Sequence, residues 1–167
     1  MLRQTALVLL AVSIRFIMPE TGHCQSHPLT PEELTTRAAI VAVGTVSQVR
    51  AEWNPGRTRI LTHVTVSVDQ YLKGGTSQAL MNLTVPGGEL GEIGEVYSHT
   101  ARFKEQERVV VFAEPDAGGA LRVSAGDQGK ITITMDRLTG RPMAAEGVSL
   151  EVLAARIRNA AGPAMQR

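Results

Sequence analysis

The sequence predicts an all-β protein: a small antiparallel barrel of five to six strands, with a short helix before it and an amphipathic helix after it. Aromatic residues make up only 4% of the 167 residues, so the core must be aliphatic. Valines cluster in short runs, as they do in β-strands. Turn signals such as NPG and PDAGG separate these runs. We expect one domain over residues 30–161.

The first 26 residues predict export. Arg3 precedes the apolar run Ala6–Val12, which is the pattern of a secretory signal peptide and is too short for a permanent membrane anchor. Small residues place the cleavage between Cys24 and Ser26, and His23 disfavours a lipoprotein. An ordinary N-terminal helix is the alternative. We therefore expect a periplasmic or secreted protein without a stable membrane span.

Processing would change both the charge and the thiol content of the chain. Removal of residues 1–26 takes away Arg3, Arg15 and Glu20, which leaves equal numbers of acidic and basic side chains. Nucleic-acid binding depends on excess positive charge, so we expect no nucleic-acid partner. Cleavage after Ser26 also removes the only cysteine and, with it, any thiol chemistry.

The first predicted element of the mature chain is a short helix. Thr30 can cap it, Pro31 suits its first position, and Glu33 completes a capping box. We expect this helix to end near Arg37. The next run, AIVAVGTVSQVRAEW, predicts a strand with Val41 and Val43 on one face and a bulge at Gly44.

The clearest strand is RILTHVTVSVDQYL, in which apolar residues alternate with polar ones. The strand ALMNLTV follows, and the later runs RVVVFAE, ALRVS and GKITITM predict three more. Ser149 can cap a final helix over residues 149–161, which should pack on the sheet. The side chains expected in the core are Ile60, Thr62, Val64, Val66 and Val68 from the first of these strands, Met81, Leu83 and Val85 from the second, and Leu150, Leu153, Ala154 and Ile157 from the helix.

Five stretches between Ala39 and Thr134 resemble an uncharacterised group of exported bacterial proteins: AAIVAVGTVSQVRAEW, THVTVSVDQYLKG, LTVPGGELG, RFKEQERVVVFAE and GDQGKITI. The layout is similar to the netrin-like modules of metalloproteinase inhibitors, which implies an OB-like barrel. Gln106 stands where the group has glycine, so we expect a different turn before the RVVVFAE strand. The resemblance supplies no catalytic residue.

The stretch VPGGELGEIGEV raises the question of a ligand site, because Glu89, Glu92 and Glu95 recur beside glycines. The glycine spacing is not that of a phosphate loop, no helix pattern follows, and three glutamates would repel a phosphate. A calcium site is the more specific alternative, because calcium prefers carboxylate and other oxygen ligands. The spacing of the glutamates, however, fits no known calcium loop. We expect a mobile, metal-free loop that takes part in binding.

Other candidate chemistry is sparse. Trp53, beside the NPG turn, is either a contact hot spot or a plug in the barrel end. His63 is expected on the outer face of its strand and His99 in a loop, with no zinc-ligand spacing. No nucleophile elbow is present, and Ser98 beside His99 does not define a triad. We predict no catalytic residues and no cofactor.

These observations favour an exported, non-enzymatic binding module. The netrin-like layout implies that its partner is an extracytoplasmic protein, with a protease as one candidate. Trp53, Glu89, Glu92 and Glu95 are the expected contact residues. Two alternatives stay open: an OB-type binder of nucleic acid or oligosaccharide, which needs stacking aromatics, and a small extracytoplasmic hydrolase. The partner, the oligomeric state and the strand order do not follow from the sequence.

Overall fold

A computed structural model of the chain describes residues 28–75, 77–144 and 147–162. The predicted signal peptide, with its cleavage site and Cys24, lies outside these residues. None of the described helices is both long enough and apolar enough to cross a membrane.

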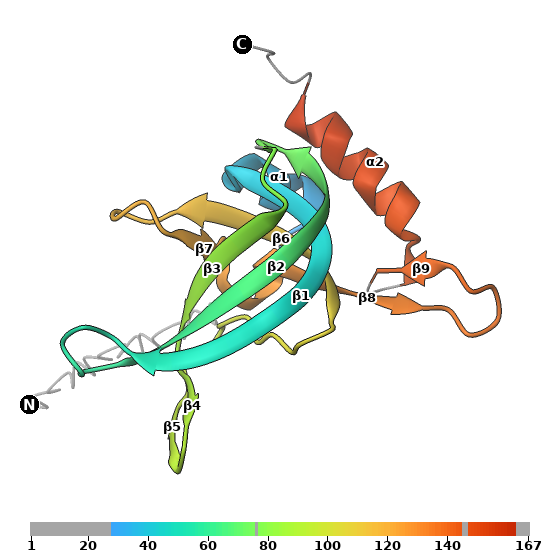
Figure 1. Ribbon diagram of the computed structural model, residues 1–167. Coiled ribbons are helices and arrows are strands. Elements are labelled where there is room, and N and C mark those ends of the chain that lie inside the picture. The colour runs from blue at the N-terminus through green and yellow to red at the C-terminus, as the bar shows by residue number, and fades with distance from the viewer. Residues whose placement is uncertain (1–27, 76, 145–146, 163–167) are drawn as a thin grey trace, which may run out of the picture.

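Five strands close into a barrel, which confirms the predicted OB-like fold (Figure 1). Each strand pairs with the next in the order β1-β2-β3-β7-β6, and β6 pairs with β1 to close the ring. All neighbours are antiparallel except β3 and β7, which run parallel where Leu83 meets Leu121. The barrel strands are β1 (Ile40–Trp53), β2 (Ile60–Lys73), β3 (Leu80–Pro86), β6 (Arg108–Pro115) and β7 (Leu121–Val123).

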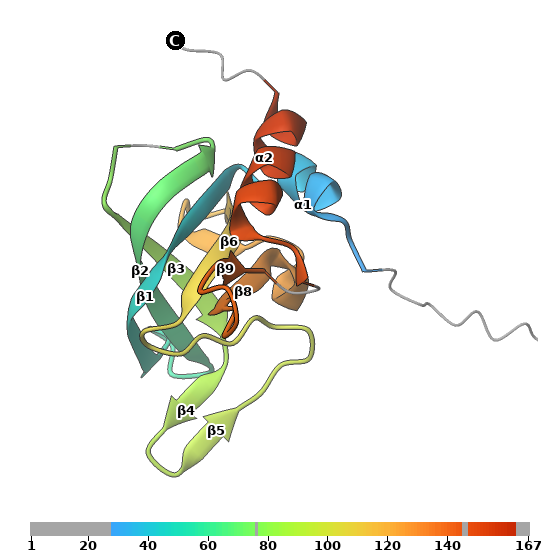
Figure 2. The ribbon, with the colours of Figure 1, turned by 90° about the vertical axis from the view of Figure 1, so that its right-hand side faces the viewer.

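Five short elements are added to this ring in the described part of the chain. A 3-10 helix, η1 (Gly126–Gly129), leads into β8 (Lys130–Met135), which pairs with β6 beside β7, and β9 (Pro142–Met143) pairs with β8. Between β3 and β6 the chain forms a separate two-stranded hairpin of β4 (Gly88–Leu90) and β5 (Ile93–Glu95). Figure 2 shows this hairpin projecting from the end of the barrel opposite the helices.

The two terminal helices form where the capping signals predict them. Helix α1 (Pro31–Arg37) has the full capping box, because Thr30 accepts from the Glu33 N–H while the Glu33 side chain accepts from the Thr30 N–H. Helix α2 (Leu150–Ala161) is capped by Ser149. The helices lie side by side (Figure 2), and Arg156 of α2 donates two hydrogen bonds to Glu32 of α1.

The barrel wall separates two hydrophobic cores. Inside the barrel, residues of β1, β2, β3 and β6 pack together, with Val46 and Val66 fully buried. On the outside, the helices cover β1 and β6, and Phe112 and Ile157 are fully buried there. The first half of β1, up to Val46, and most of β6 are therefore buried on both faces, which explains the apolar runs IVAV and VVVFA.

The expected strand faces are confirmed. In β2, Ile60, Thr62, Val64 and Val66 are buried, and Val68 is partly buried against the inner core. In β1, Val41 and Val43 share the face under the helices. The pairing of β1 with β2 shifts register between Val43 and Gly44, as a bulge requires. A Cβ at Gly44 would collide with the Ser67 carbonyl, so this close approach of the two strands excludes a larger residue.

Candidate functional site

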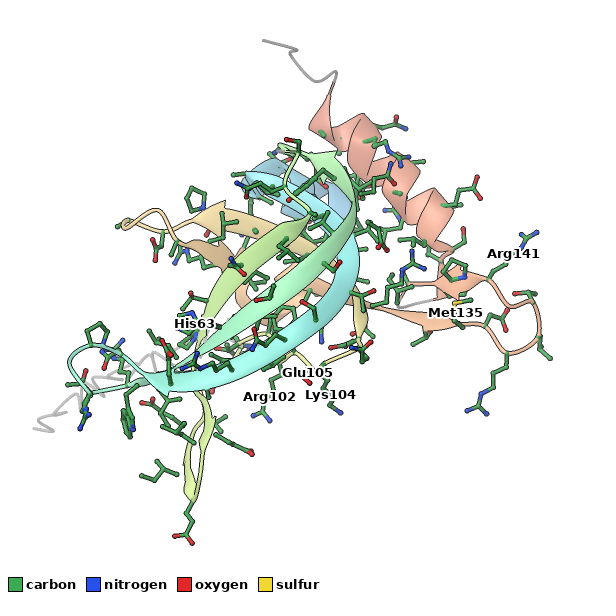
Figure 3. The ribbon with its side chains drawn as sticks, in the orientation of Figure 1. His63, Arg102, Lys104, Glu105, Met135 and Arg141 are labelled. Atoms are coloured by element: carbon green, nitrogen blue, oxygen red, sulfur yellow. The ribbon has the colours of Figure 1, made fainter. Side chains whose placement is uncertain are left out.

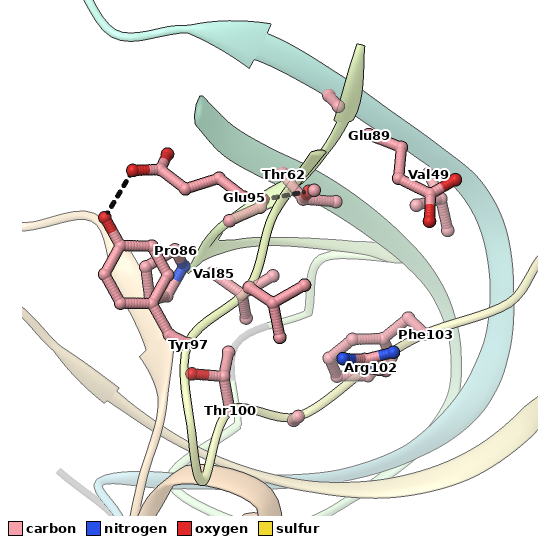
Figure 4. A pocket seen from close by; sticks show the side chains of 15 residues that line it. Val49, Thr62, Val85, Pro86, Glu89, Glu95, Tyr97, Thr100, Arg102 and Phe103 are labelled. Atoms are coloured by element: carbon pink, nitrogen blue, oxygen red, sulfur yellow. Dashed lines mark hydrogen bonds between the residues drawn. The ribbon is translucent and has the colours of Figure 1, made fainter. Parts of the chain in front are cut away.

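A pocket of about 330 Å³ lies at one end of the barrel (Figure 4). Its floor is formed by the last part of β1, the first part of β2 and the end of β3. One wall is the β4–β5 hairpin, and the other is the segment 96–103 that follows it. We call this part of the molecule the pocket end. Its apolar lining residues include Val49, Ala51, Val85, Val96 and Phe103.

The hairpin wall corrects one prediction. The stretch after Pro86 was expected to be a mobile loop, but it forms β4 and β5 joined by a tight turn. The Gly87 N–H donates to the Ile60 carbonyl at 2.8 Å, which ties the hairpin to β2. Gly88 has a φ of 141°, and a Cβ there would meet Thr62 Oγ1. The glycine allows β4 to lie directly on the barrel strands.

Glu95 anchors the other strand of the hairpin. Its Oε2 accepts from the Ile60 N–H at 2.5 Å, and its Oε1 accepts from the Tyr97 hydroxyl at 2.7 Å. These two hydrogen bonds favour the charged carboxylate, so they hold the pKa of Glu95 below its ordinary value. The hydrogen bond between Glu95 and Tyr97 also raises the pKa of the Tyr97 hydroxyl. Glu95 is thus a structural latch as well as a pocket residue.

The other two glutamates have different positions. Glu89, on β4, lines the pocket, and its carboxylate has no hydrogen-bond or ion-pair partner among residues 28–75, 77–144 and 147–162. Glu92 lies in the turn between β4 and β5, is exposed, and does not line the pocket. The three carboxylates do not converge. In the described part of the chain, no group of three metal-ligating residues could hold an ion.

Trp53 belongs to the pocket end without lining the pocket. Trp53 pairs with Ile60 across β1 and β2, and the Glu95 carboxylate accepts a hydrogen bond from the Ile60 N–H. Trp53 and Glu95 are therefore both held at the same backbone position of β2. Trp53 is 38% exposed and belongs to neither core, so it does not plug the barrel. Ile93 in the hairpin and Val96 beside it are 55% and 72% exposed. Three large apolar side chains are therefore exposed on the pocket end, and of these only Val96 lines the pocket itself.

Behind the second wall lies a network that sequence reasoning did not find. Lys130 Nζ lies 2.7 Å from both carboxylate oxygens of Glu107. It also donates to the Arg102 carbonyl at 2.5 Å and lies 5.1 Å from the centre of the Phe103 ring. Burial raises the pKa of Glu107, but the hydrogen bonds from Lys130 and Thr132 outweigh it, and the net pKa is lowered. This network fixes the backbone and ring that face the pocket.

A signal for this network was present in the sequence. Phe103 and Glu107 belong to the stretch RFKEQERVVVFAE, and Lys130 belongs to GDQGKITI. Both stretches were singled out for their resemblance to a group of proteins, but the two were not connected with each other. The structure brings them together.

The histidines of the described chain are placed as expected but form no site. His63 lies on the outer face of β2, where its Nε2 is 3.1 Å from Glu52 (Figure 3). His99 lies in the loop after β5, with its Nδ1 3.9 Å from Asp127. Each histidine therefore pairs with a single surface carboxylate. The His63 side chain is 44% exposed and also lies 3.3 Å from the Thr84 hydroxyl, and the His99 side chain is 80% exposed.

The fold and the site together define a class of protein, an OB-like barrel with an open pocket at one end. No protein-family model matches the chain, and no curated protein matches it. The resemblance to exported bacterial proteins and to netrin-like modules therefore stays a prediction.

Proposed function

We propose that this protein is an exported, non-enzymatic binding module that recognises another extracytoplasmic protein through its pocket end. The observation that carries the proposal is the presence of exposed apolar side chains in the elements that build the pocket end: the end of β1, the β4–β5 hairpin and the residue after it. Trp53, Ile93 and Val96 are large apolar residues left in contact with solvent. Aromatic and aliphatic residues at the centre of an exposed patch are the usual contact residues of protein interfaces.

The construction of the walls supports the same function. Glu95 latches the hairpin to β2, and Lys130 holds the segment that contains Arg102 and Phe103. A recognition surface gains affinity when its parts are already in place, because less conformational entropy is lost on binding. The netrin-like layout supports an extracytoplasmic protease as the first partner to test.

The two alternative functions, binding of nucleic acid or oligosaccharide and hydrolysis, need features that are scarce at the pocket end. Stacking of nucleotides or sugars needs aromatic faces. Of the pocket-lining residues, two are aromatic: Tyr97, whose hydroxyl is bound to Glu95, and Phe103. A hydrolase needs a nucleophile next to a base. The pocket residues Thr62 and Tyr97 use their hydroxyls in structural hydrogen bonds, and the Thr100 hydroxyl has no histidine or carboxylate partner within the residues that the structure describes. These observations favour a protein partner.

Affinity capture from the cell envelope with quantitative mass spectrometry tests the proposal. We expect wild-type protein to enrich a specific partner that Trp53→Ala and Val96→Asp variants lose. Leu138→Asp is the matched control, because Leu138 is 96% exposed and lies in the turn between β8 and β9. Equal enrichment by all four proteins would show that the pocket end is not the recognition surface.

A further inference from the structure

The polar groups of the pocket divide into those already used by the fold and those left free. Thr62 Oγ1 donates to the Gly87 carbonyl at 2.6 Å. Glu95 and Tyr97 bind one another, and Glu95 also holds the Ile60 N–H. These groups have their partners within the walls, so a ligand would gain little from them.

Two charged side chains of the pocket are free, and they have opposite signs. Glu89 stands on the hairpin wall and Arg102 on the facing wall. The Arg102 guanidinium has no ion-pair or hydrogen-bond partner in the described ranges, although its backbone carbonyl is held by Lys130. Figure 3 shows Arg102 pointing away from the barrel near Lys104, and Arg102 is one of the residues that line the pocket. The two free charges do not pair with each other.

Apart from Thr100 and the glycines, the rest of the lining is apolar. Val49, Ala51 and Val85 form the floor, and Val96 and Phe103 complete the sides. The volume of about 330 Å³ is at the lower end of the range of about 300–1,000 Å³ typical of ligand pockets. It suits one apolar side chain with its adjoining backbone better than a large ligand.

We propose that the pocket takes the C-terminal residue of the partner protein, with an apolar side chain on the pocket floor and the terminal carboxylate on Arg102. A guanidinium presents paired N–H donors that match a carboxylate, and capture of a chain terminus is a known mode of peptide recognition. The backbone N–H of the same terminal residue is a donor for the Glu89 carboxylate. One residue thus supplies an anion, a donor and an apolar group.

This proposal rests on the proposed function and can be tested separately from it. The probe is a fluorescein-labelled Gly-Gly-Ser-Phe peptide with a free C-terminus, measured by fluorescence anisotropy against the same peptide with a C-terminal amide. Loss of a charged hydrogen bond should weaken binding by about tenfold or more, so we expect the amide to bind at least that much more weakly. Free phenylalanine, added as a competitor, should displace the peptide poorly.

Variants assign the effect to the pocket. Arg102→Gln should bind acid and amide alike, and Arg102→Lys should keep part of the preference. Both variants retain the backbone carbonyl that Lys130 holds. Lys104→Gln is the matched control, because Lys104 is an exposed cation two residues away that does not line the pocket, and it should behave as wild type.

Each contrary result has a defined meaning. Equal binding of acid and amide, or an unchanged preference in Arg102→Gln, would overturn the terminal-carboxylate proposal. If partner capture still depended on Trp53 and Val96, the binding function would survive that failure. Displacement by free phenylalanine as effective as by the peptide would overturn the choice of a protein terminus and indicate a free amino acid as ligand.

Discussion

Lys130 and Glu107 form a largely buried ion pair that joins two parts of the chain 23 residues apart, with side chains only 11% and 16% exposed. Thr132 adds a hydrogen bond to Glu107 at 2.6 Å, and Phe103 lies beside the ammonium group. Lys130, at the start of β8, also donates to the Arg102 carbonyl, so the pair is connected to the segment that forms one wall of the pocket. It therefore links the stability of the barrel to the shape of the site.

Removing one member of this pair should be costly. We expect Lys130→Met to lower the free energy of unfolding by about 3 kcal/mol, because it leaves a mostly buried carboxylate without its cation. Urea denaturation measures the change. Arg50→Met is the control, since the Arg50–Glu52 pair is solvent-exposed and should contribute less than about 1 kcal/mol.

A double variant separates charge from packing. Lys130→Met combined with Glu107→Leu should recover part of the lost stability, because an apolar pair can replace a buried ion pair at little cost. Additive losses from the two substitutions would show that the ion pair is not what couples these residues.

The sequence predicted the local features well and the long-range ones poorly. The alternation of Val64 and Val66 with Thr65 is visible in a few consecutive residues, and the Thr30–Glu33 capping box spans only four. By contrast, no local pattern marks a contact between Glu107 and Lys130. Such pairs depend on barrel closure, which the order of strands along the chain does not reveal.

The glycine-rich stretch shows the same limit within the candidate site. Strands β4 and β5 have three residues each, too short for a readable alternation, so the stretch was interpreted as a loop. The anchor that orders it, Glu95 on the Ile60 N–H, spans 35 residues of sequence. Glu89, Glu92 and Glu95 looked equivalent in sequence, but their roles differ because only Glu95 reaches the barrel.

The different roles of the three glutamates give a further prediction. Glu95→Gln should lower the thermal unfolding midpoint at pH 7, because the amide is a weaker acceptor for the Ile60 N–H and the Tyr97 hydroxyl. Glu89→Gln and Glu92→Gln should leave the midpoint unchanged. A loss of equal size in all three variants would mean that general charge, rather than the latch, is responsible.

The same latch predicts a pH dependence. The folded-state pKa of Glu95 lies below its ordinary value of 4.5, so its contribution is complete above about that pH and is lost as the pH falls through the lowered value. The difference in midpoint between wild type and Glu95→Gln should therefore shrink on acidification below pH 4.5. Calorimetric scans of both proteins at pH 7 and pH 3 measure it, and a constant difference would contradict the assignment.

Gln106 is a site where substitution should stabilise the protein. It has a φ of 63°, a left-handed conformation that costs a residue with a Cβ about 1 kcal/mol relative to glycine. Its N–H donates to the Val46 carbonyl at 2.8 Å, so the conformation is fixed by the barrel. We expect Gln106→Gly to raise the free energy of unfolding by up to about 1 kcal/mol in urea denaturation. A loss of stability would show that the side chain contributes more than the strain costs.

The register of β2 gives a further pair of variants. Val66 is completely buried inside the barrel, so Val66→Asp should prevent folding, because an unpaired buried carboxylate costs several kcal/mol. The Thr65 side chain lies on the outer face and donates to Asn82 Oδ1 at 3.0 Å, so Thr65→Asp should still fold. Circular dichroism of both variants distinguishes the two faces, and equal damage would mean that the register is wrong.

The central claim is that the pocket end is the surface that recognises a partner. Site-specific photo-crosslinking in intact cells tests it most directly, with a benzophenone amino acid replacing either Val96 or Val152. Both valines are exposed, at 72% and 53%, but Val96 lines the pocket and Val152 lies on α2. We predict one discrete covalent adduct from position 96 and none from position 152. An adduct from position 152 with none from position 96 would contradict the claim.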